Sequence, residues 1–125
     1  MINLLLVMAG GGLGAGMRHL SNLAAVRFFG SGFPWGTAFV NVFGSFLMGV
    51  LVELLARKLG MSQHWRMFLA SGCLGGFTTF SSFSLDTMNL IDKGAAGLAI
   101  AYVAGSVILG VAALFAGLLS VRALL

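Results

Sequence analysis

Four long apolar stretches, separated by short polar segments, dominate the hydropathy pattern of the chain. They cover residues 2–29, 36–56, 67–91 and 95–121. Each stretch has roughly the 20 residues that an α-helix needs to cross the hydrocarbon layer of a membrane. The connecting segments hold turn-forming and interfacial residues, among them Pro34, Trp35, Trp65 and Gly94. The pattern predicts an all-α integral membrane protein, with four transmembrane helices per subunit in a single membrane domain over residues 1–125.

The third stretch contains a segment that is poorly suited to a regular helix. Residues 71–84 (SGCLGGFTTFSSFS) include three glycines and two β-branched threonines. Irregular backbone at membrane depth is tolerated only where protein buries it or where it lines a cavity. We therefore expect the third helix to be broken near Gly75 to Thr79. Such a break would free backbone carbonyl groups as ligands for a hard cation such as sodium.

Composition supports a membrane protein. Of the 125 residues, 59% are hydrophobic and 8% are charged, whereas an ordinary soluble domain has about 25% charged residues. A small globular protein has a large surface for its volume, and so few charges cannot cover it in water. The seven basic residues are scattered along the chain, so we expect no nucleic-acid partner, which would need a basic patch.

The basic residues are nearly balanced between the two ends of the predicted bundle. One end would hold Arg57, Lys58, Arg66 and Arg122, and the other would hold Arg27 and Lys93. Orientation normally follows a clear excess of Lys and Arg in the cytoplasmic loops, so this weak bias permits insertion in either direction. The 19 glycines allow helix backbones to approach closely in lipid, which suggests contact with a second subunit.

Polar residues inside the second and fourth stretches recur at the spacing of one helix face. They are Thr37, Asn41, Ser45 and Glu53 in the second stretch, and Tyr102 and Ser106 in the fourth. Polar groups inside a membrane segment are costly and often functional, although a hydroxyl can also bond back to its own helix. Asn41 is the strongest candidate, because its amide offers two donors that the local backbone does not satisfy. Glu53 lies near the end of its helix, where we expect an interfacial or paired role.

Phe80 and Phe83 are three residues apart and are separated by Ser81 and Ser82. The edge of an aromatic ring carries a partial positive charge. Ring edges, hydroxyls and the amide of Asn41 together offer weak donors without a fixed cation, which suits a small dehydrated anion that must enter and leave. Taken alone, the two phenylalanines are better explained as lipid-facing or core residues.

Patterns typical of enzymes are missing from the sequence. Neither His19 nor His64 has an acidic or cysteine partner at the spacing of metal ligands. We find no pairing of a nucleophile with a base and no carboxylate dyad. We therefore expect no enzymatic activity.

Three segments together closely resemble the Fluc (CrcB) family of small bacterial fluoride channels. They are residues 14–18 (GAGMR), 36–45 (GTAFVNVFGS) and 72–83 (GCLGGFTTFSSF). The similarity covers essentially the whole chain. It implies a multi-pass protein of the bacterial inner (plasma) membrane that passively exports fluoride and relieves fluoride toxicity. It also implies an antiparallel, dual-topology homodimer with two pores and a central structural sodium ion.

The same resemblance implies roles for individual residues. The pore phenylalanines fall on Phe80 and Phe83, the pore asparagine falls on Asn41, and the vestibule arginine falls on Arg18. The backbone carbonyls that hold the sodium ion would belong to Gly75 and Thr78. Further candidates for a polar track along the pore are Ser81, Thr37, Tyr102 and Ser106. The residues by themselves do not identify fluoride as the ion.

Two other functions stay open at this point. A small four-helix multidrug exporter would need an acidic residue embedded in the membrane, but the first stretch has none and Glu53 lies close to the end of the second. A non-transporting subunit of a membrane assembly would produce no ion flux on its own.

Overall fold

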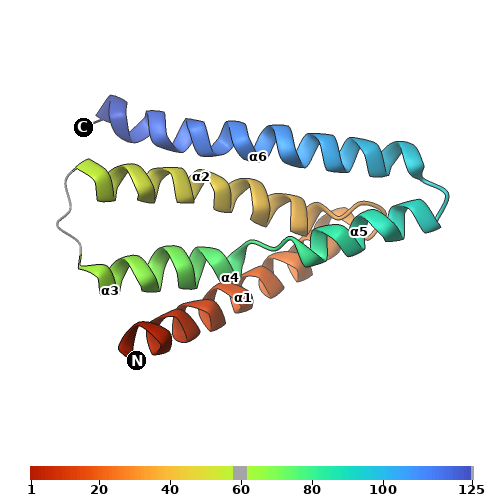
Figure 1. Cartoon of the computed structure of the whole chain (residues 1–125). Helices are drawn as coiled ribbons and strands as arrows, with labels where there is room; N and C mark the ends of the chain where they lie inside the picture. The colour runs from red at the N-terminus through yellow and green to blue at the C-terminus, as the bar shows by residue number, and fades with distance from the viewer. Residues whose placement is uncertain (58–61, 125) are drawn as a thin grey trace.

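The computed structural model describes residues 1–57 and 62–124, which are almost entirely helical. The long helices are α1 (Ile2–Phe29), α2 (Trp35–Arg57) and α6 (Ala96–Leu124). The third stretch forms α3 (Gln63–Arg66), the π-helix η1 (Met67–Leu74), α4 (Gly75–Phe77) and α5 (Ser81–Asp92). These elements run roughly side by side, with both chain termini at the same end (Figure 1). Lys58, one of the bases in the predicted charge balance, lies outside the described residues.

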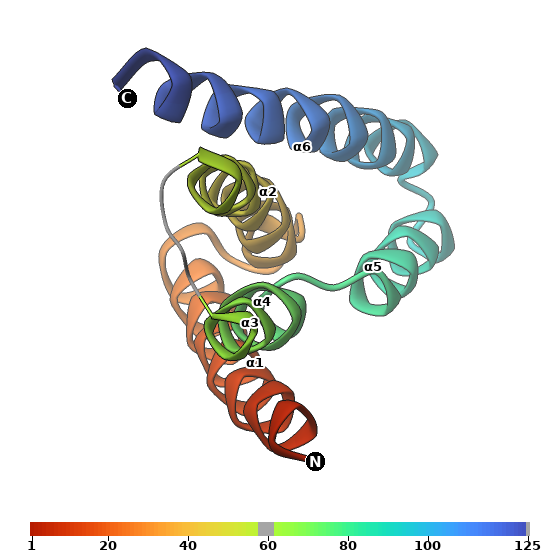
Figure 2. The ribbon, with the colours of Figure 1, turned by 60° about the vertical axis from the view of Figure 1, so that its left-hand side comes forward.

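The helices pack in two main pairs, α2 against α6 and α1 against η1. Figure 2 shows α6 passing over α2, and α1 running beneath the segment that carries α3 and α4. Glycines let the first pair approach until the backbones touch. A Cβ on Gly49 would collide with the carbonyl of Leu114, and one on Gly117 with the carbonyl of Phe46. Small residues at such contacts are typical of helices that associate in lipid.

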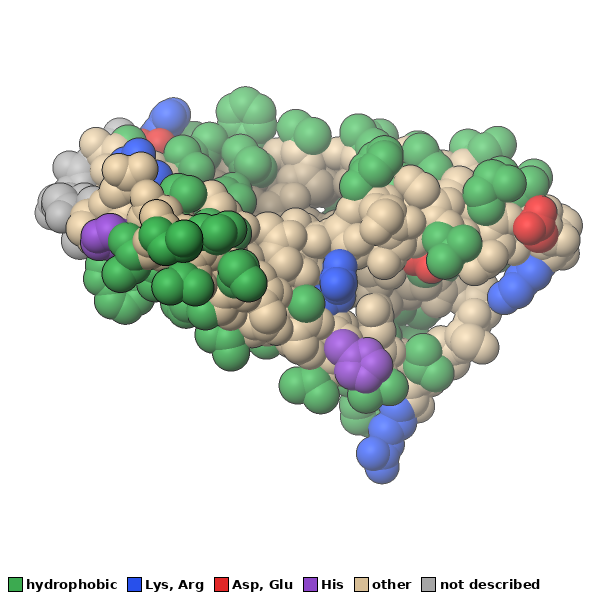
Figure 3. Space-filling view, turned by 60° about the horizontal axis from the view of Figure 1, so that its bottom comes forward, with side chains coloured by type: hydrophobic (Ala, Val, Ile, Leu, Met, Phe, Trp, Pro, Cys, Tyr) green, Lys and Arg blue, Asp and Glu red, His purple; other side chains and the backbone are tan. Residues whose placement is uncertain are grey.

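The outer surface of the chain is apolar. Two helical segments, Trp35–Ala56 and Ala96–Leu124, are long and apolar enough to cross a membrane, and only 11% of the most apolar window of the second is buried. Figure 3 shows large hydrophobic side chains spread over the exposed face, with few charges between them. An exterior of this kind needs lipid or another subunit as its surroundings. The fold is therefore that of an all-helical membrane protein.

An ion pair joins the ends of α2 and α6. The Nε of Arg122 donates to Oε1 of Glu53 at 3.1 Å, and Glu53 is only 7% exposed. Glu53 thus has the paired role that its position near the helix end suggested.

The interruption of the third stretch lies at Thr78–Phe80, between α4 and α5. Thr78 is extended, with φ −85° and ψ 159°. The sequence predicted a break starting at Gly75, but residues 75–77 are helical. The reason is packing, since a Cβ on Gly76 would collide with the backbone of Gly11 in α1. These glycines allow two helices to touch, and the break begins only after that contact ends.

Candidate functional site

The side-chain amide of Asn41 clips the backbone of the break to α2. The Nδ2 of Asn41 donates to the carbonyl of Thr79 at 3.0 Å, and the N–H of Thr79 donates back to Oδ1 of Asn41 at 2.8 Å. An asparagine amide can act as donor and acceptor at once, so this one side chain replaces both helical hydrogen bonds that Thr79 lacks. We call this pair of hydrogen bonds the Asn41 clip.

The Asn41 clip changes what the neighbouring carbonyl groups can bind. In a regular α-helix the N–H of Thr79 would donate to the carbonyl of Gly75, and the N–H of Ser82 to that of Thr78. Here the first N–H donates to Asn41, and the second donates to Oγ1 of Thr79 at 3.3 Å. The carbonyls of Gly75 and Thr78 have therefore lost their helical donors. These are the two carbonyls that the resemblance assigned to sodium.

A cavity of about 490 Å³ opens beside the break. Its walls come from α2, α4, α5, α6 and the interrupted segment, and among residues 1–57 and 62–124 no charged side chain lines it. It brings together six of the ten residues to which the resemblance gave a role, namely Asn41, Gly75, Thr78, Phe80, Phe83 and Ser106. We call it the break cavity.

The two phenylalanines of the break cavity differ in their surroundings. Their ring centroids are 5.9 Å apart and the rings are tilted by 47°. Phe80 is 77% exposed in the single chain, whereas the ring of Phe83 packs against Tyr102, with centroids 4.9 Å apart. The ring of Phe83 is thus held by Tyr102 of the same chain. The ring of Phe80 faces outward, toward lipid or a neighbouring subunit.

Tyr102 joins this aromatic pair to a buried polar network. The tyrosine is 1% exposed, and its hydroxyl donates to Oδ2 of Asp86 at 3.1 Å. Thr37, itself 5% exposed, lies near the tyrosine hydroxyl. The two polar-track candidates Thr37 and Tyr102 are therefore buried in the same region, but they lie outside the walls of the break cavity.

A second cavity, of about 320 Å³, lies at the end of the molecule that carries the α1–α2 and α5–α6 connections. We call it the outer cavity. One face of α5 lines it with the polar residues Ser82, Asp86, Asn89 and Lys93. The sequence analysis missed this face, although the spacing of four, three and four residues is itself the signal of one helix face.

Three predicted site residues, Tyr102, Ser81 and Arg18, line neither cavity, whereas Thr37 lines the outer cavity. Ser81 is exposed at the start of α5, with its Oγ 3.5 Å from Oγ1 of Thr79. Arg18 is half-buried on α1, one helical turn before Asn22, which lines the outer cavity. Arg18 and Asn22 are four residues apart and therefore share one face of α1. This position near the outer cavity is compatible with the vestibule role that the resemblance implies for Arg18.

Side chains do not form a metal site in the part of the chain that the structure describes. No three His, Cys, Asp or Glu residues among residues 1–57 and 62–124 lie close enough to hold an ion. Backbone carbonyls, such as those of Gly75 and Thr78, are ligands of a different kind.

Comparison with known proteins identifies the family. Residues 5–118 match the family described as CrcB-like protein, Camphor Resistance (CrcB). The chain belongs to the CrcB family.

A protein of Chelativorans sp. (strain BNC1), named fluoride-specific ion channel FluC, is 56% identical over 125 residues, which is 100% of both chains. Its namesake in Agrobacterium fabrum (strain C58 / ATCC 33970) is 52% identical over 118 residues, 94% of each chain. A third CrcB relative of the same name, from Rhodopseudomonas palustris (strain BisB5), is 54% identical over 120 residues, which cover 96% of this chain and 97% of that one.

The Asn41 clip should protect the backbone amide of Thr79 from hydrogen exchange. Asn41→Ala removes both bonds to Thr79, and each polar group left unpaired at membrane depth costs about 1–3 kcal/mol. We expect the amide of Thr79 to exchange with deuterium at least about tenfold faster, since about 1.4 kcal/mol corresponds to a factor of ten. Hydrogen exchange of the purified protein measures this. Ser45→Ala is the control, because the Ser45 hydroxyl bonds only to the carbonyl of Asn41 in its own helix. Equal protection of Thr79 in both variants would contradict the clip.

Proposed function

We propose that this chain is a passive channel selective for fluoride, which exports the ion across the bacterial inner membrane and relieves fluoride toxicity. The observation that carries the proposal is the break cavity, whose lining combines Phe80, Phe83, Asn41 and Ser106 without a charged side chain. Membership of the CrcB family supports it, as do relatives at 52–56% identity named fluoride-specific ion channels.

Fluoride is small, and it must exchange its hydration shell for groups of the protein if it is to cross. Ring edges and hydroxyl groups are weak donors, so an ion that they hold is also released. A fixed cation in the same position would bind the anion too tightly for conduction. One of the two N–H groups of the Asn41 amide is engaged with the Thr79 carbonyl, so the other is left as a donor.

We further propose that a structural sodium ion is held by the carbonyls of Gly75 and Thr78 from two subunits. The support is that both carbonyls lost their helical donors to the Asn41 clip and to the Thr79 hydroxyl. Carbonyl oxygens suit a hard cation, and discontinuous membrane helices are known to use them in this way. The ion would add a positive charge to the centre of the assembly without placing a cationic side chain in the path.

The second subunit would be an antiparallel copy of the same chain, giving two pores in a dual-topology homodimer. Phe80 is 77% exposed and Gly75 is exposed, so both site residues face outward from a single chain. A second copy would cover them and supply the matching pair of carbonyls. The weak bias of basic residues along the sequence removes the usual obstacle to insertion in both orientations.

The two alternatives have less support. A multidrug exporter would need an unengaged acid in the membrane, but the described acid of α2, Glu53, is bonded to Arg122 at the helix ends. Neither that function nor a non-transporting role in a membrane assembly appears in the names of the relatives reported above.

The role of the phenylalanine rings can be tested in liposomes that contain only the purified protein. Phe80→Ile and Phe83→Ile keep a bulky apolar side chain but remove the ring edge, so we expect dimers of normal size and fluoride efflux reduced by orders of magnitude. Phe115→Ile is the matched control, because Phe115 is 57% exposed on α6 and lines neither cavity. Wild-type efflux in both pore variants would refute the assignment.

The sodium proposal predicts that the ion stabilises the protein by mass action. We expect a higher melting temperature in sodium chloride than in choline chloride at equal ionic strength. Thr78→Ser keeps the carbonyl and should keep this difference, whereas Asn41→Ala disturbs the backbone of the break and should abolish it. The wild-type protein melting at one temperature in both salts would count against a bound sodium ion.

Dual topology can be measured by labelling a single introduced cysteine. Ser31→Cys on a Cys73→Ala background places one thiol in the connection between α1 and α2. An impermeant maleimide added outside intact cells should label about half of the chains, and permeabilisation should expose the rest. Labelling of all chains, or of none, from outside would exclude mixed orientation.

A further inference from the structure

Two further cavities lie along helix α2, and their walls are apolar. One, of about 370 Å³, lies between α1 and α2 near their connection, and its α1 lining includes the small residues Ser21, Ala24 and Ala25. The other, of about 280 Å³, lies farther along α2 and is also lined by η1. The Ser21 hydroxyl, the polar group of this lining, donates to the carbonyl of Met17 in its own helix at 2.9 Å.

The two cavities follow one face of α2 and form a continuous groove. Five residues at a spacing of four share this slowly drifting face, and they are Trp35, Phe39, Phe43, Leu47 and Leu51. The rings of Phe39 and Phe43 stack, with centroids 5.4 Å apart and an interplanar angle of 13°. Phe39 lines the first cavity and Phe43 the second, so the stacked pair joins them. We call the two cavities together the seam groove.

The seam groove opens on the opposite side of α2 from the break cavity. Asn41 lines the break cavity, and Phe39 and Phe43 are each two residues from it. Because each residue of a helix advances by about 100°, each of these rings lies about 160° around the helix from Asn41. The second subunit proposed above covers the break side of the chain, where Phe80 is exposed. The seam groove is therefore left facing the lipid.

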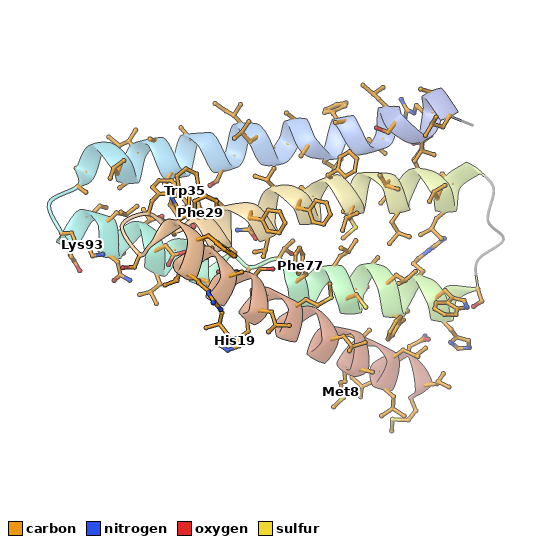
Figure 4. The ribbon with its side chains drawn as sticks, turned by 180° about the vertical axis from the view of Figure 1, so that it is seen from behind. Met8, His19, Phe29, Trp35, Phe77 and Lys93 are labelled. Atoms are coloured by element: carbon orange, nitrogen blue, oxygen red, sulfur yellow. The ribbon has the colours of Figure 1, made fainter. Side chains whose placement is uncertain are left out.

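The groove runs from the membrane–water interface into the hydrocarbon layer. Phe28, Phe29 and Phe39 line its outer part with exposed rings. Figure 4 shows Phe29 beside Trp35 at the end of the molecule, and Phe77, which lines the inner cavity, nearer the middle. Tryptophan is typical of the level of the lipid headgroups. An apolar groove that begins at this level and continues inward has the course of a lipid chain.

We propose that the seam groove binds one acyl chain of a membrane phospholipid, from the leaflet at the α1–α2 connection. Half of the hydrocarbon layer is about 15 Å thick, which corresponds to about ten residues of α2. A chain whose headgroup lies near Trp35 would thus fill the first cavity and enter the second beyond Phe43. Apolar walls without a partner forfeit their van der Waals contacts, and the chain restores them.

The proposal rests on the proposed function only in assigning the break side of the chain to a second subunit. In the antiparallel dimer the two seam grooves would open toward opposite leaflets. Lipid provides no hydrophobic force that favours one apolar contact over another, so the fit between the rings and the small α1 residues retains the chain. Among residues 1–57 and 62–124, no charged side chain lines the groove. Binding should therefore not depend on the charge of the headgroup.

The test is native mass spectrometry of the purified dimer released from nanodiscs. The nanodiscs contain phosphatidylglycerol and phosphatidylethanolamine in equal amounts and with identical acyl chains. We expect each chain to retain one lipid, drawn about equally from the two headgroups because the fit of the acyl chain decides binding. Ala24→Phe fills the first cavity with a ring and should abolish retention. Ser21→Leu is a second filling variant, since the hydroxyl that it removes bonds only within α1.

Ala112→Phe is the matched control and should retain lipid as the wild type does. Ala112 is exposed on α6, lines none of the four cavities and lies about 120° around that helix from Ser106 of the break cavity. A wild-type dimer without retained lipid would overturn the proposal. So would filling variants that stay dimeric and retain as much lipid as the wild type, or retention of phosphatidylglycerol alone.

Fluoride efflux of the same preparations separates this inference from the proposed channel. A wild-type dimer that retains lipid but conducts no fluoride would overturn the channel and support the groove. A monomer that retains one lipid would overturn the dimer and still support the groove. A dimer that conducts fluoride but retains no lipid would overturn the groove alone.

Discussion

The reciprocal pair of hydrogen bonds between Asn41 and Thr79 is the interaction on which the rest of the site depends. A membrane helix normally satisfies every backbone group internally, because lipid offers no partners. The side chain of Asn41 supplies both a donor and an acceptor at 2.8–3.0 Å, so the third segment can stop and restart. The interruption leaves the carbonyls of Gly75 and Thr78 without their helical donors, and it turns Phe80 outward at the start of α5.

The sequence was sufficient for the class of fold, and it selected several residues that the structure brings together around the break cavity. Apolar stretches of membrane-spanning length predicted the helices, and the glycines and threonines of the third stretch predicted that it is broken. The position of the break was wrong by three residues at its start, because glycine has two uses that the sequence alone does not separate. Gly76 permits contact with Gly11, whereas the interruption itself lies at Thr78–Phe80.

The sequence indicated which polar side chains to single out more readily than it indicated their hydrogen-bond partners. Asn41 was selected because its amide has no local partner, but sequence spacing does not reveal that the partner is backbone 38 residues away. The polar face of α5 escaped notice for a different reason. Asp86 and Lys93 differ in charge and lie two turns apart, so only a cavity that both line brings them into one feature. Long-range packing, and not local propensity, decides both cases.

The central prediction is that the protein conducts fluoride and excludes chloride. Fluoride and chloride efflux should be compared in liposomes that contain the purified wild-type chain and no other protein, with ion-selective electrodes and a potassium ionophore to balance charge. We predict rapid fluoride efflux and chloride efflux no faster than from empty liposomes. Fluoride release that equals the leak of empty liposomes, or chloride release as fast as that of fluoride, would contradict the assignment of the break cavity as a fluoride path.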